Sequence, residues 1–354
     1  MKVMAPPYIG EMTAQEPMDI AAGRPLRTLP KAHLHAHLDG SYPRESVEAL
    51  ALRNSVDLTS SGTFTDVWQF FDAYATVPRL VQSHEDLAGL CRALVHAEAA
   101  EGVIYFEPAI EPQLYAPRLG GIEQVTHTML AAFAEAADDA GIEVGAMLTI
   151  NTDSDSAAEI VETLSELAAQ LAGHGVTSLG TAGFVEPGNL SRFASHARRA
   201  RAAGLGVVSH AGQTGGPASV EEALDELGAC RISHGIRSIE SERLLERLAE
   251  EGIVCDVCPV SNVSLRLVPS LEAHPGPRLW DAGVPITLNA DDQLWFSASV
   301  TDQYVVAREV WGLDDRTVAD IALAGIRATG MSSSTRNRFR AEVDVWMQQE
   351  VGIA

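Results

Sequence analysis

The sequence predicts a single (β/α)8 barrel of the TIM type, in which eight parallel strands alternate with helices. Short apolar segments rich in β-branched residues alternate with longer amphipathic stretches rich in Ala and Glu. The 354 residues, 46% of them hydrophobic, suffice for one large core. No linker or internal repeat divides the sequence. A doubly wound sheet, the second candidate, would give the same alternation.

The expected elements follow one another from residue 32 onward. The strand segments are 32–38, 103–110, 143–151, 177–184, 206–212, 231–236, 253–259 and 285–292. Helical patterns lie between most of them, at 83–101, 121–141, 156–173, 190–204, 218–228 and 239–251. Three closing helices are expected at the C-terminus, at 299–312, 315–328 and 333–351.

Two segments fall outside this alternation. The gap at 39–102 is long enough to hold extra helices after the first strand, and the aromatic residues of 64–80 have the helical spacing typical of a core-facing stripe. Residues 1–27 contain several prolines and show no period, so we expect an N-terminal arm that can be disordered. The barrel domain would then comprise 28–354.

Composition narrows the classes of partner. The formal charge of −23, from 25 basic and 48 acidic residues, disfavours nucleic acids and anionic membranes and leaves a small molecule as the expected partner. The sequence shows no secretory signal, and no apolar run reaches the roughly 18 residues of a membrane span, so we expect a cytoplasmic protein. Cys255 and Cys258 form a CxxC within an apolar run, which favours strand cysteines over a redox or zinc-ribbon motif.

Several potential metal ligands stand at the ends of predicted strands. His35 and His37 are two residues apart, so on a strand they share a face. The other candidates follow later strand segments, namely His210, His234, Asp291 and Asp292. In a parallel barrel these ends converge on one face, where active sites are built. Three imidazoles and one carboxylate would leave a metal position open for water, as in a catalytic site. They suit one Zn²⁺ best, although Fe²⁺, Co²⁺ and Mn²⁺ are alternatives.

Five segments resemble motifs of the adenosine deaminase family. Residues 30–40 read PKAHLHAHLDG, like the family's opening motif, and 209–212 read SHAG, like its HAG segment. Residues 231–235 (RISHG), 258–262 (CPVSN) and 288–292 (LNADD) are similar to R-I-x-H-G, CPxSN and LNTDD. The five segments stand in the family's order. The resemblance implies a TIM barrel that binds one Zn²⁺ through His35, His37, His210 and Asp291.

The resemblance also implies roles for the residues around the metal. His234 would orient the attacking hydroxide, and the backbone N–H of Gly183 would contact the purine. Asp292 would accept a hydrogen bond from the purine edge, and Asp39 would reach a ribose hydroxyl. The implied activity is hydrolytic deamination of an adenosine-like or modified aminopurine nucleoside, in which a metal-activated hydroxide attacks the amino-bearing ring carbon. The LDG of 38–40, where adenine deaminases have IEG, favours a nucleoside over a free base.

Gln213 departs from the family pattern, because it follows His-Ala-Gly where the family has Glu. That Glu protonates the ring nitrogen during attack, and an amide has no titratable proton with which to do so. Three explanations stay open. An introduced Glu→Gln substitution would leave a catalytically impaired protein. A different heterocycle could be the substrate, with Gln213 selecting its ring tautomer. Lastly, the protein could bind a nucleoside without catalysis.

Further departures near the strand ends favour a divergent pocket over a single substitution. Ala109 stands where the family often has Arg, and Gln293 replaces its usual Pro. Glu111 and His33 are additional polar groups near the expected active face. Either could replace the missing acid, but a structural role is the preferred interpretation of both. The sequence leaves the oligomeric state open.

Overall fold

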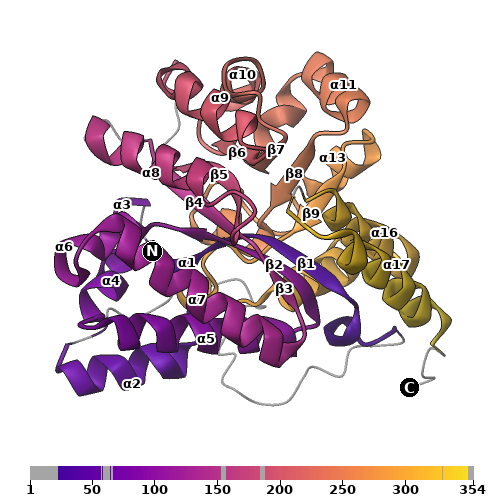
Figure 1. Ribbon diagram of the computed structural model, residues 1–354. Helices are drawn as coiled ribbons and strands as arrows, with labels where there is room; N and C mark the ends of the chain where they lie inside the picture. Colours follow the sequence, from indigo (N-terminus) through magenta and orange to yellow (C-terminus); the bar gives the residue numbers. More distant parts are fainter. Residues whose placement is uncertain are drawn as a thin grey trace, which may run out of the picture.

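Figure 1 shows the protein as a computed structural model in which helices surround a parallel barrel. The structure describes residues 23–56, 58, 64, 67–152, 157–183, 188–328 and 330–349. Most of the expected N-terminal arm, residues 1–22, lies outside the described residues. Near the end of that arm, Leu26 is buried and Arg24 forms an ion pair with Asp315, with 3.0 Å between Nη1 and Oδ2.

Eight strands follow one another in chain order around the barrel, and every neighbouring pair is parallel. They are β1 (Lys31–His37), β2 (Val103–Ile110), β4 (Ala146–Asn151), β5 (Val176–Ala182), β6 (Gly206–Ala211), β7 (Arg231–His234), β8 (Val254–Val257) and β9 (Ile286–Leu288). A short strand, β3 (Glu143–Val144), pairs with β2. All residues of β1 and β2 are buried, as expected for parallel strands covered on both faces. The prediction of a barrel is confirmed.

The barrel closes between β1 and the segment after β9. The backbone N–H of Asp291 donates to the His35 carbonyl at 3.1 Å, and the N–H of His37 donates to the Asp291 carbonyl at 2.9 Å. A parallel bridge also joins Ala36 to Asp291. Three of the predicted metal ligands therefore lie at the seam that closes the barrel.

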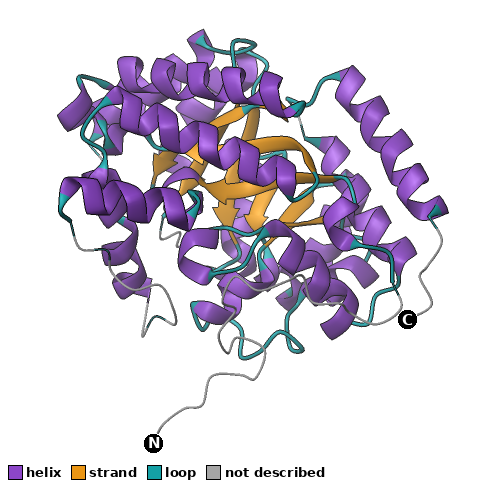
Figure 2. Cartoon of the chain, turned by 90° about the horizontal axis from the view of Figure 1, so that it is seen from below, coloured by secondary structure: helices purple, strands orange, loops and turns teal. Residues whose placement is uncertain are grey.

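Helices form the outer layer, as Figure 2 shows from below. The barrel helices are α5 (His84–Ala100), α7 (Ile122–Ala140), α8 (Ala158–Gln170), α9 (Ala194–Ala202), α10 (Gly216–Glu222), α11 (Glu242–Glu251), α13 (Gly276–Asp281), α16 (Asp315–Ala324) and α17 (Ser333–Gln348). Extra helices follow β1, namely α1 (Leu38–Ser41), α2 (Arg44–Asn54), α3 (Val67–Tyr74) and α4 (Thr76–Leu80). Short helices elsewhere are α6 (Ala116–Leu119), α12 (Pro259–Ser264), α14 (Gln293–Phe296) and α15 (Val300–Val305).

The remaining helical turns are single 3-10 or π turns. They are η1 (Leu26–Thr28), η2 (Pro112–Leu114), η3 (Ser191–Phe193), η4 (Ala223–Leu227), η5 (Ile236–Glu240), η6 (Val306–Val310) and η7 (Gly325–Arg327). Several of them lie within predicted helices, because η4 continues α10, η6 continues α15, η7 continues α16, and η3 leads into α9. Among the described residues, no helix is long and apolar enough to cross a membrane.

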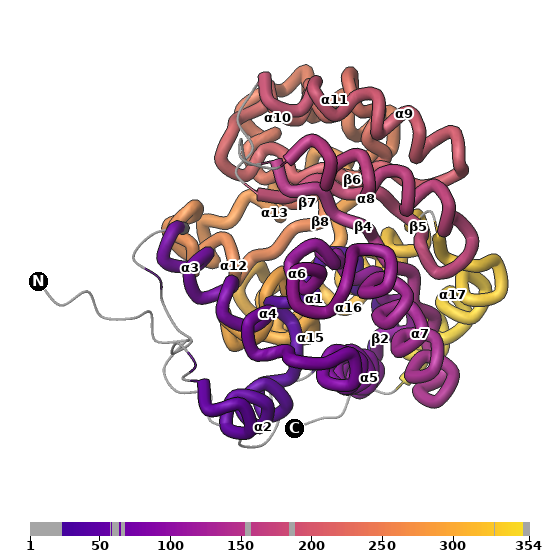
Figure 3. Tube along the Cα trace, turned by 60° about the vertical axis from the view of Figure 1, so that its left-hand side comes forward, coloured from indigo at the N-terminus to yellow at the C-terminus, as the bar shows by residue number. Residues whose placement is uncertain are grey.

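Element boundaries follow from local chemistry. Helix α5 begins after Ser83, whose side chain accepts from the N–H of Asp86 in a capping box. The strand expected at 143–151 is divided at Gly145, where a Cβ would lie 2.5 Å from the Thr177 side chain. The helix expected over 64–80 is seen as two helices, α3 and α4, which follow one another along the chain in Figure 3.

Candidate active site

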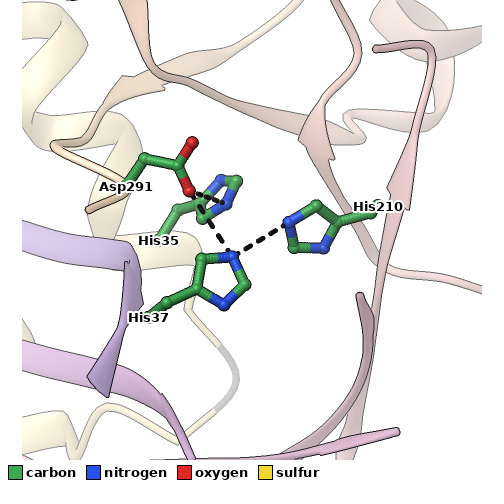
Figure 4. Close-up of side chains that lie close together, drawn as sticks. All are labelled: His35, His37, His210 and Asp291. Carbon is green, nitrogen blue, oxygen red and sulfur yellow. Dashed lines mark hydrogen bonds and ion pairs between the residues drawn. The ribbon is translucent and has the colours of Figure 1, made fainter. Parts of the chain in front are cut away.

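Four predicted metal ligands converge at the carboxyl ends of the strands (Figure 4). His35 and His37 extend from β1, His210 from β6, and Asp291 follows β9. The Oδ1 atom of Asp291 lies 3.1 Å from Nε2 of His35 and 3.4 Å from Nε2 of His37. The Nε2 atoms of His37 and His210 are 3.2 Å apart. One ligand atom from each residue lies within 4.8 Å of those of the others, which is close enough to surround one cation.

The hydrogen bonds of the rings direct nitrogen lone pairs into this cluster. Nδ1 of His210 lies 2.7 Å from the Thr181 carbonyl, which can only accept, so Nδ1 carries the proton and Nε2 the lone pair. Nδ1 of His35 faces the Asp256 carbonyl at 3.3 Å, and its buried Nε2 has no hydrogen-bond partner in the described part of the chain. Unprotonated imidazole nitrogens facing one another and a carboxylate fit a divalent cation such as Zn²⁺.

Electrostatics also favour the ligand forms of these side chains. Burial lowers the pKa of His37 to about 4 and that of His210 well below its usual range, so both rings are neutral at pH 7. Burial alone would raise the pKa of Asp291, but His35 and the other imidazoles hold it well below its ordinary value. His37 and His210 therefore present neutral imidazoles and Asp291 a carboxylate, which are the forms that bind metal. At His35, burial alone would lower the pKa, but the neighbouring Asp291 carboxylate raises it above its usual value.

Two site residues have left-handed backbone conformations that residues other than glycine rarely adopt. Asp291 has φ 64° and His234 has φ 69°. At Asp291 this conformation lets the backbone bond β1 while Oδ1 faces the histidines. Oδ2 accepts from the Ser261 hydroxyl at 2.6 Å. At His234 the left-handed conformation ends β7, and Nε2 of the ring lies 3.9 Å from Oδ2 of Asp291. Such conformations cluster at functional sites.

Side chains behind the cluster fix the position of β1. Oδ1 of Asn289 accepts the backbone N–H groups of Leu34 and His35, at 2.8 and 3.1 Å. His33, on the same strand, contacts Glu98 through Nδ1 at 2.7 Å, and its Nε2 accepts from the N–H of Ala290 at 3.0 Å. Because His33 is fully buried between these groups, it serves the structure of the seam.

A buried ionic network occupies the barrel between β2, β7 and β8. The Arg231 guanidinium contacts Glu107 and donates to Oδ2 of Asp256 at 2.6 Å. It also donates to the Leu34 carbonyl, one residue before His35, at 3.2 Å. The carboxylates raise the pKa of Arg231 despite its burial. This network joins the strand that carries the first two ligands to the opposite wall of the barrel.

A pocket of about 630 Å³ opens above the cluster. Most of the predicted site residues line it, namely His37, Gly183, His210, Gln213, His234, Asp291 and Asp292. The Gln213 amide makes no hydrogen bond within the described ranges, and Oδ1 of Asp292 is buried without a described partner. His35 lies behind the pocket wall. Asp39 also lies behind it, fully buried, with the Tyr74 hydroxyl 3.3 Å from its Oδ2.

The pocket contains residues that sequence reasoning did not assign to the site. Phe70, Phe71 and Tyr74 of α3 line it, although their spacing indicated a core stripe. Glu111 after β2 also lines it, although a structural role was preferred for this residue. An apolar stripe on a helix indicates that one face of the helix is covered, but not by what. The aromatic spacing alone therefore did not predict that α3 lines a pocket.

The cysteines give no sign of a redox or zinc-ribbon motif. All four are free, and Cys255 lies buried in β8. The buried Sγ of Cys258 lies 3.5 Å from Nδ1 of His35, which groups it with His35 and His234 as a possible metal cluster. Burial raises the pKa of Cys258 well above its usual value, so this neighbour is a neutral thiol.

Comparisons with known proteins agree with the geometry. The family model described as adenosine deaminase matches residues 30–346. The chain is 37% identical to an adenine deaminase of Chelativorans, over 86% of this chain and 95% of that protein. It is 34% identical to a putative adenosine/adenine deaminase of Streptomyces coelicolor, over 92% and 98% respectively. A crystal structure of adenine deaminase from Arthrobacter aurescens matches with a TM-score of 0.81 and 30% identity, covering 90% of this chain and 99% of that one.

Proposed function

The chain belongs to the adenosine deaminase family and is a metal-dependent deaminase, and from this premise we propose that its substrate is an adenosine-like or modified aminopurine nucleoside. The observation that carries the proposal is the convergence of four ligand atoms below a pocket of about 630 Å³. That volume lies within the usual range of small-molecule pockets and leaves room for a nucleoside.

We assign metal binding to the four converging residues and favour Zn²⁺, because three imidazoles and one carboxylate form a preferred donor set for this ion. When bound, the cation would supply a hydroxide at neutral pH. The residues that hold it are His35, His37, His210 and Asp291.

The surrounding residues would bind and orient the substrate. Oδ1 of Asp292, buried without a described partner, is available to accept an N–H of the purine, and the Gly183 backbone is available to contact the ring. His234 would orient the attacking oxygen. Overall, the oxygen of one water would bond to the amino-bearing carbon and the carbon–nitrogen bond would break. One proton of that water would leave with the amino group as ammonia, and the other would end on the ring nitrogen. Gln213 can hydrogen-bond the ring nitrogen but cannot give it a proton.

Ammonia release from purified, metal-loaded protein tests this proposal. Adenosine, 2′-deoxyadenosine and adenine are compared by a coupled ammonia assay and by the change in purine absorbance. We expect kcat/KM to be higher for the nucleosides than for adenine. Faster turnover of adenine would mean that the substrate is the free base and not the nucleoside, as the adenine deaminase relatives suggest. Absence of ammonia from every aminopurine would contradict the proposal.

A further inference from the structure

The wall of the pocket at the ends of β1 and β2 is rich in carboxylates and poor in hydrogen-bond donors. The Tyr74 hydroxyl lies 3.3 Å from Oδ2 of Asp39 and 3.2 Å from Oε2 of Glu111. A phenol has one proton, so Tyr74 donates to one of these carboxylates at a time. The second oxygen of each has its own donor, because Tyr115 donates to Oδ1 of Asp39 and Gln113 donates to Oε1 of Glu111 at 3.1 Å. Two buried carboxylates thus compete for one proton.

Two acidic side chains of the same wall are buried. Glu111 and Asp292 line the pocket and are 6% and 2% exposed, respectively. Oδ1 of Asp292 is buried without a partner among the described residues. Within the described lining, Arg266 is the single Lys or Arg, and its side chain is exposed. A ligand group in this region therefore meets buried acceptor oxygens and gains little from the exposed, screened cation.

We propose that Tyr74 and Glu111 form a subsite that takes a neutral or cationic hydrogen-bond donor of the substrate and excludes phosphate. This inference rests on the proposed function, and it narrows the substrate class to unphosphorylated aminopurine compounds whose polar arm ends in hydroxyl or ammonium groups. A phosphate would place negative charge beside buried carboxylates, and like charges at close range cost several kcal/mol. Tyr74 and Glu111 select the arm without touching the reacting carbon.

Three ligands that differ in one substituent test the subsite. They are adenosine, 5′-amino-5′-deoxyadenosine and AMP, compared in wild type, E111Q and D72N. Asp72 lines the same pocket but is exposed, so D72N is a charge-matched control. We expect wild type to prefer the amine and adenosine over AMP by at least about 100-fold in kcat/KM. E111Q is expected to reduce that preference about tenfold, and D72N less than threefold.

Binding measurements separate failure of this inference from failure of the proposed function. Calorimetry with the same three ligands measures binding and does not require turnover. We expect the amine to bind more tightly than AMP in wild type, and we expect this difference in affinity to shrink in E111Q. If no ligand is deaminated but this order of affinity holds, the proposed function fails and the subsite stands. AMP binding as tightly as the amine, or equal effects of E111Q and D72N, would overturn the subsite.

A second inference comes from an independent chain of hydrogen bonds behind His234. The N–H of Gly276, which can only donate, lies 3.0 Å from Nδ1 of His274, so that nitrogen is an acceptor. Nε2 of His274 then carries the proton and donates to Oδ1 of Asn262 at 3.1 Å. The Asn262 amide nitrogen therefore faces Nδ1 of His234, at 3.2 Å, and donates to it.

The direction of this chain determines the tautomer of His234. Since Nδ1 accepts, a neutral His234 ring carries its proton on Nε2, the atom that faces the metal cluster. His274 is 4% exposed and stacks on Trp311, with ring centroids 5.3 Å apart and planes at 19°. Burial lowers the pKa of His274 to about 3, so it stays neutral and keeps one direction of donation at physiological pH.

We infer that Asn262 and His274 are positioning residues that hold His234 as a donor toward the attacking oxygen. The variant N262D tests this inference, because a carboxylate only accepts and therefore moves the His234 proton to Nδ1. We expect kcat to fall about 10²–10⁴-fold with KM changed less than threefold, as for other wrong-tautomer variants. H274L should lower kcat about tenfold, whereas H274Q should retain it, because its amide can donate to Asn262.

Nuclear magnetic resonance of metal-free protein provides a readout independent of turnover. Imidazole ¹⁵N shifts distinguish protonated from unprotonated nitrogen. We expect the proton of His234 on Nε2 in wild type and H274Q, and on Nδ1 in N262D. A wild-type His234 protonated on Nδ1, or an N262D enzyme with unchanged kcat, would overturn the inference.

Discussion

At the scale of single residues, the sequence motifs pointed to the residues of the metal cluster but not to the aromatic residues of α3 that line the pocket. His35, His37, His210 and Asp291 converge because each stands at a strand end, and strand ends meet on one face of a parallel barrel. Glu111 also follows a strand, β2, and was expected near this face, although a structural role was preferred for it. Tyr74 could not be assigned in this way, because its place in the pocket depends on how α3 packs over the barrel mouth, which a periodic pattern does not specify.

Gln213 gives the first prediction at this scale. Q213E restores a titratable proton beside the pocket without changing the size of the side chain. We expect kcat for adenosine to rise about 10²–10⁴-fold, the usual contribution of a positioned general acid. The same assay on Q124E, the same exchange at an exposed position of α7, provides the control. An unchanged rate in Q213E would mean that the natural substrate needs no acid at this position.

At the scale of elements, the strand segments were located correctly but several of their ends were not. The strand predicted at 231–236 ends at His234, because Gly235 has φ 67° and turns the chain. The strand predicted at 285–292 forms a ladder over Ile286–Leu288 only. The residues after Leu288 leave the ladder, and Asp291 bonds to β1 where the barrel closes and joins the metal cluster. Both strands are therefore shorter than the sequence predicts.

Strand β1 carries the second prediction, which concerns Asn289. N289A removes the acceptor that holds the backbone of Leu34 and His35, so the two β1 ligands lose their support. We expect metal affinity to fall about 10–100-fold, as for other supporting residues of metal sites. Competition with a chelator measures this change. N54A is the control, since the Asn54 amide also bonds to the backbone, donating to the Leu80 carbonyl, but lies on α2. Equal affinities for N289A and N54A would contradict the role of Asn289.

At the scale of the whole molecule, the alternation of elements fitted both a barrel and a doubly wound sheet. The two architectures differ in whether the last strand returns to the first. The hydrogen bonds between β1 and Asp291 show that it does, and they join residues more than 250 positions apart. No local pattern reports such a contact, which is why the five ordered motifs contributed more to the prediction of the barrel than periodicity did.

His274 gives a prediction about global stability. Burial holds its pKa at about 3, below the value of about 6.5 expected in the unfolded chain. Below pH 6.5 the unfolded state binds more protons, so the contribution of His274 to stability is complete above pH 6.5 and is lost as the pH falls toward 3. At pH 5 the loss is about 2 kcal/mol.

Urea unfolding at pH 7 and pH 5 checks this expectation. The free energy of unfolding should fall by about 2 kcal/mol more in wild type than in H274Q, which cannot titrate. H96N is the control, because the His96 side chain is 47% exposed. A pH dependence in H274Q equal to that of wild type would contradict the assignment of a neutral, buried His274.

The claim that one metal ion at the four-residue cluster enables deamination is tested most directly by metal analysis joined to activity. We expect purified protein to contain about one equivalent of a divalent transition metal. Chelation should abolish ammonia release, Zn²⁺ should restore it at a 1:1 ratio, and D291N should hold much less metal than wild type. Full ammonia release from chelated, metal-free protein, or an undiminished metal content in D291N, would contradict the account.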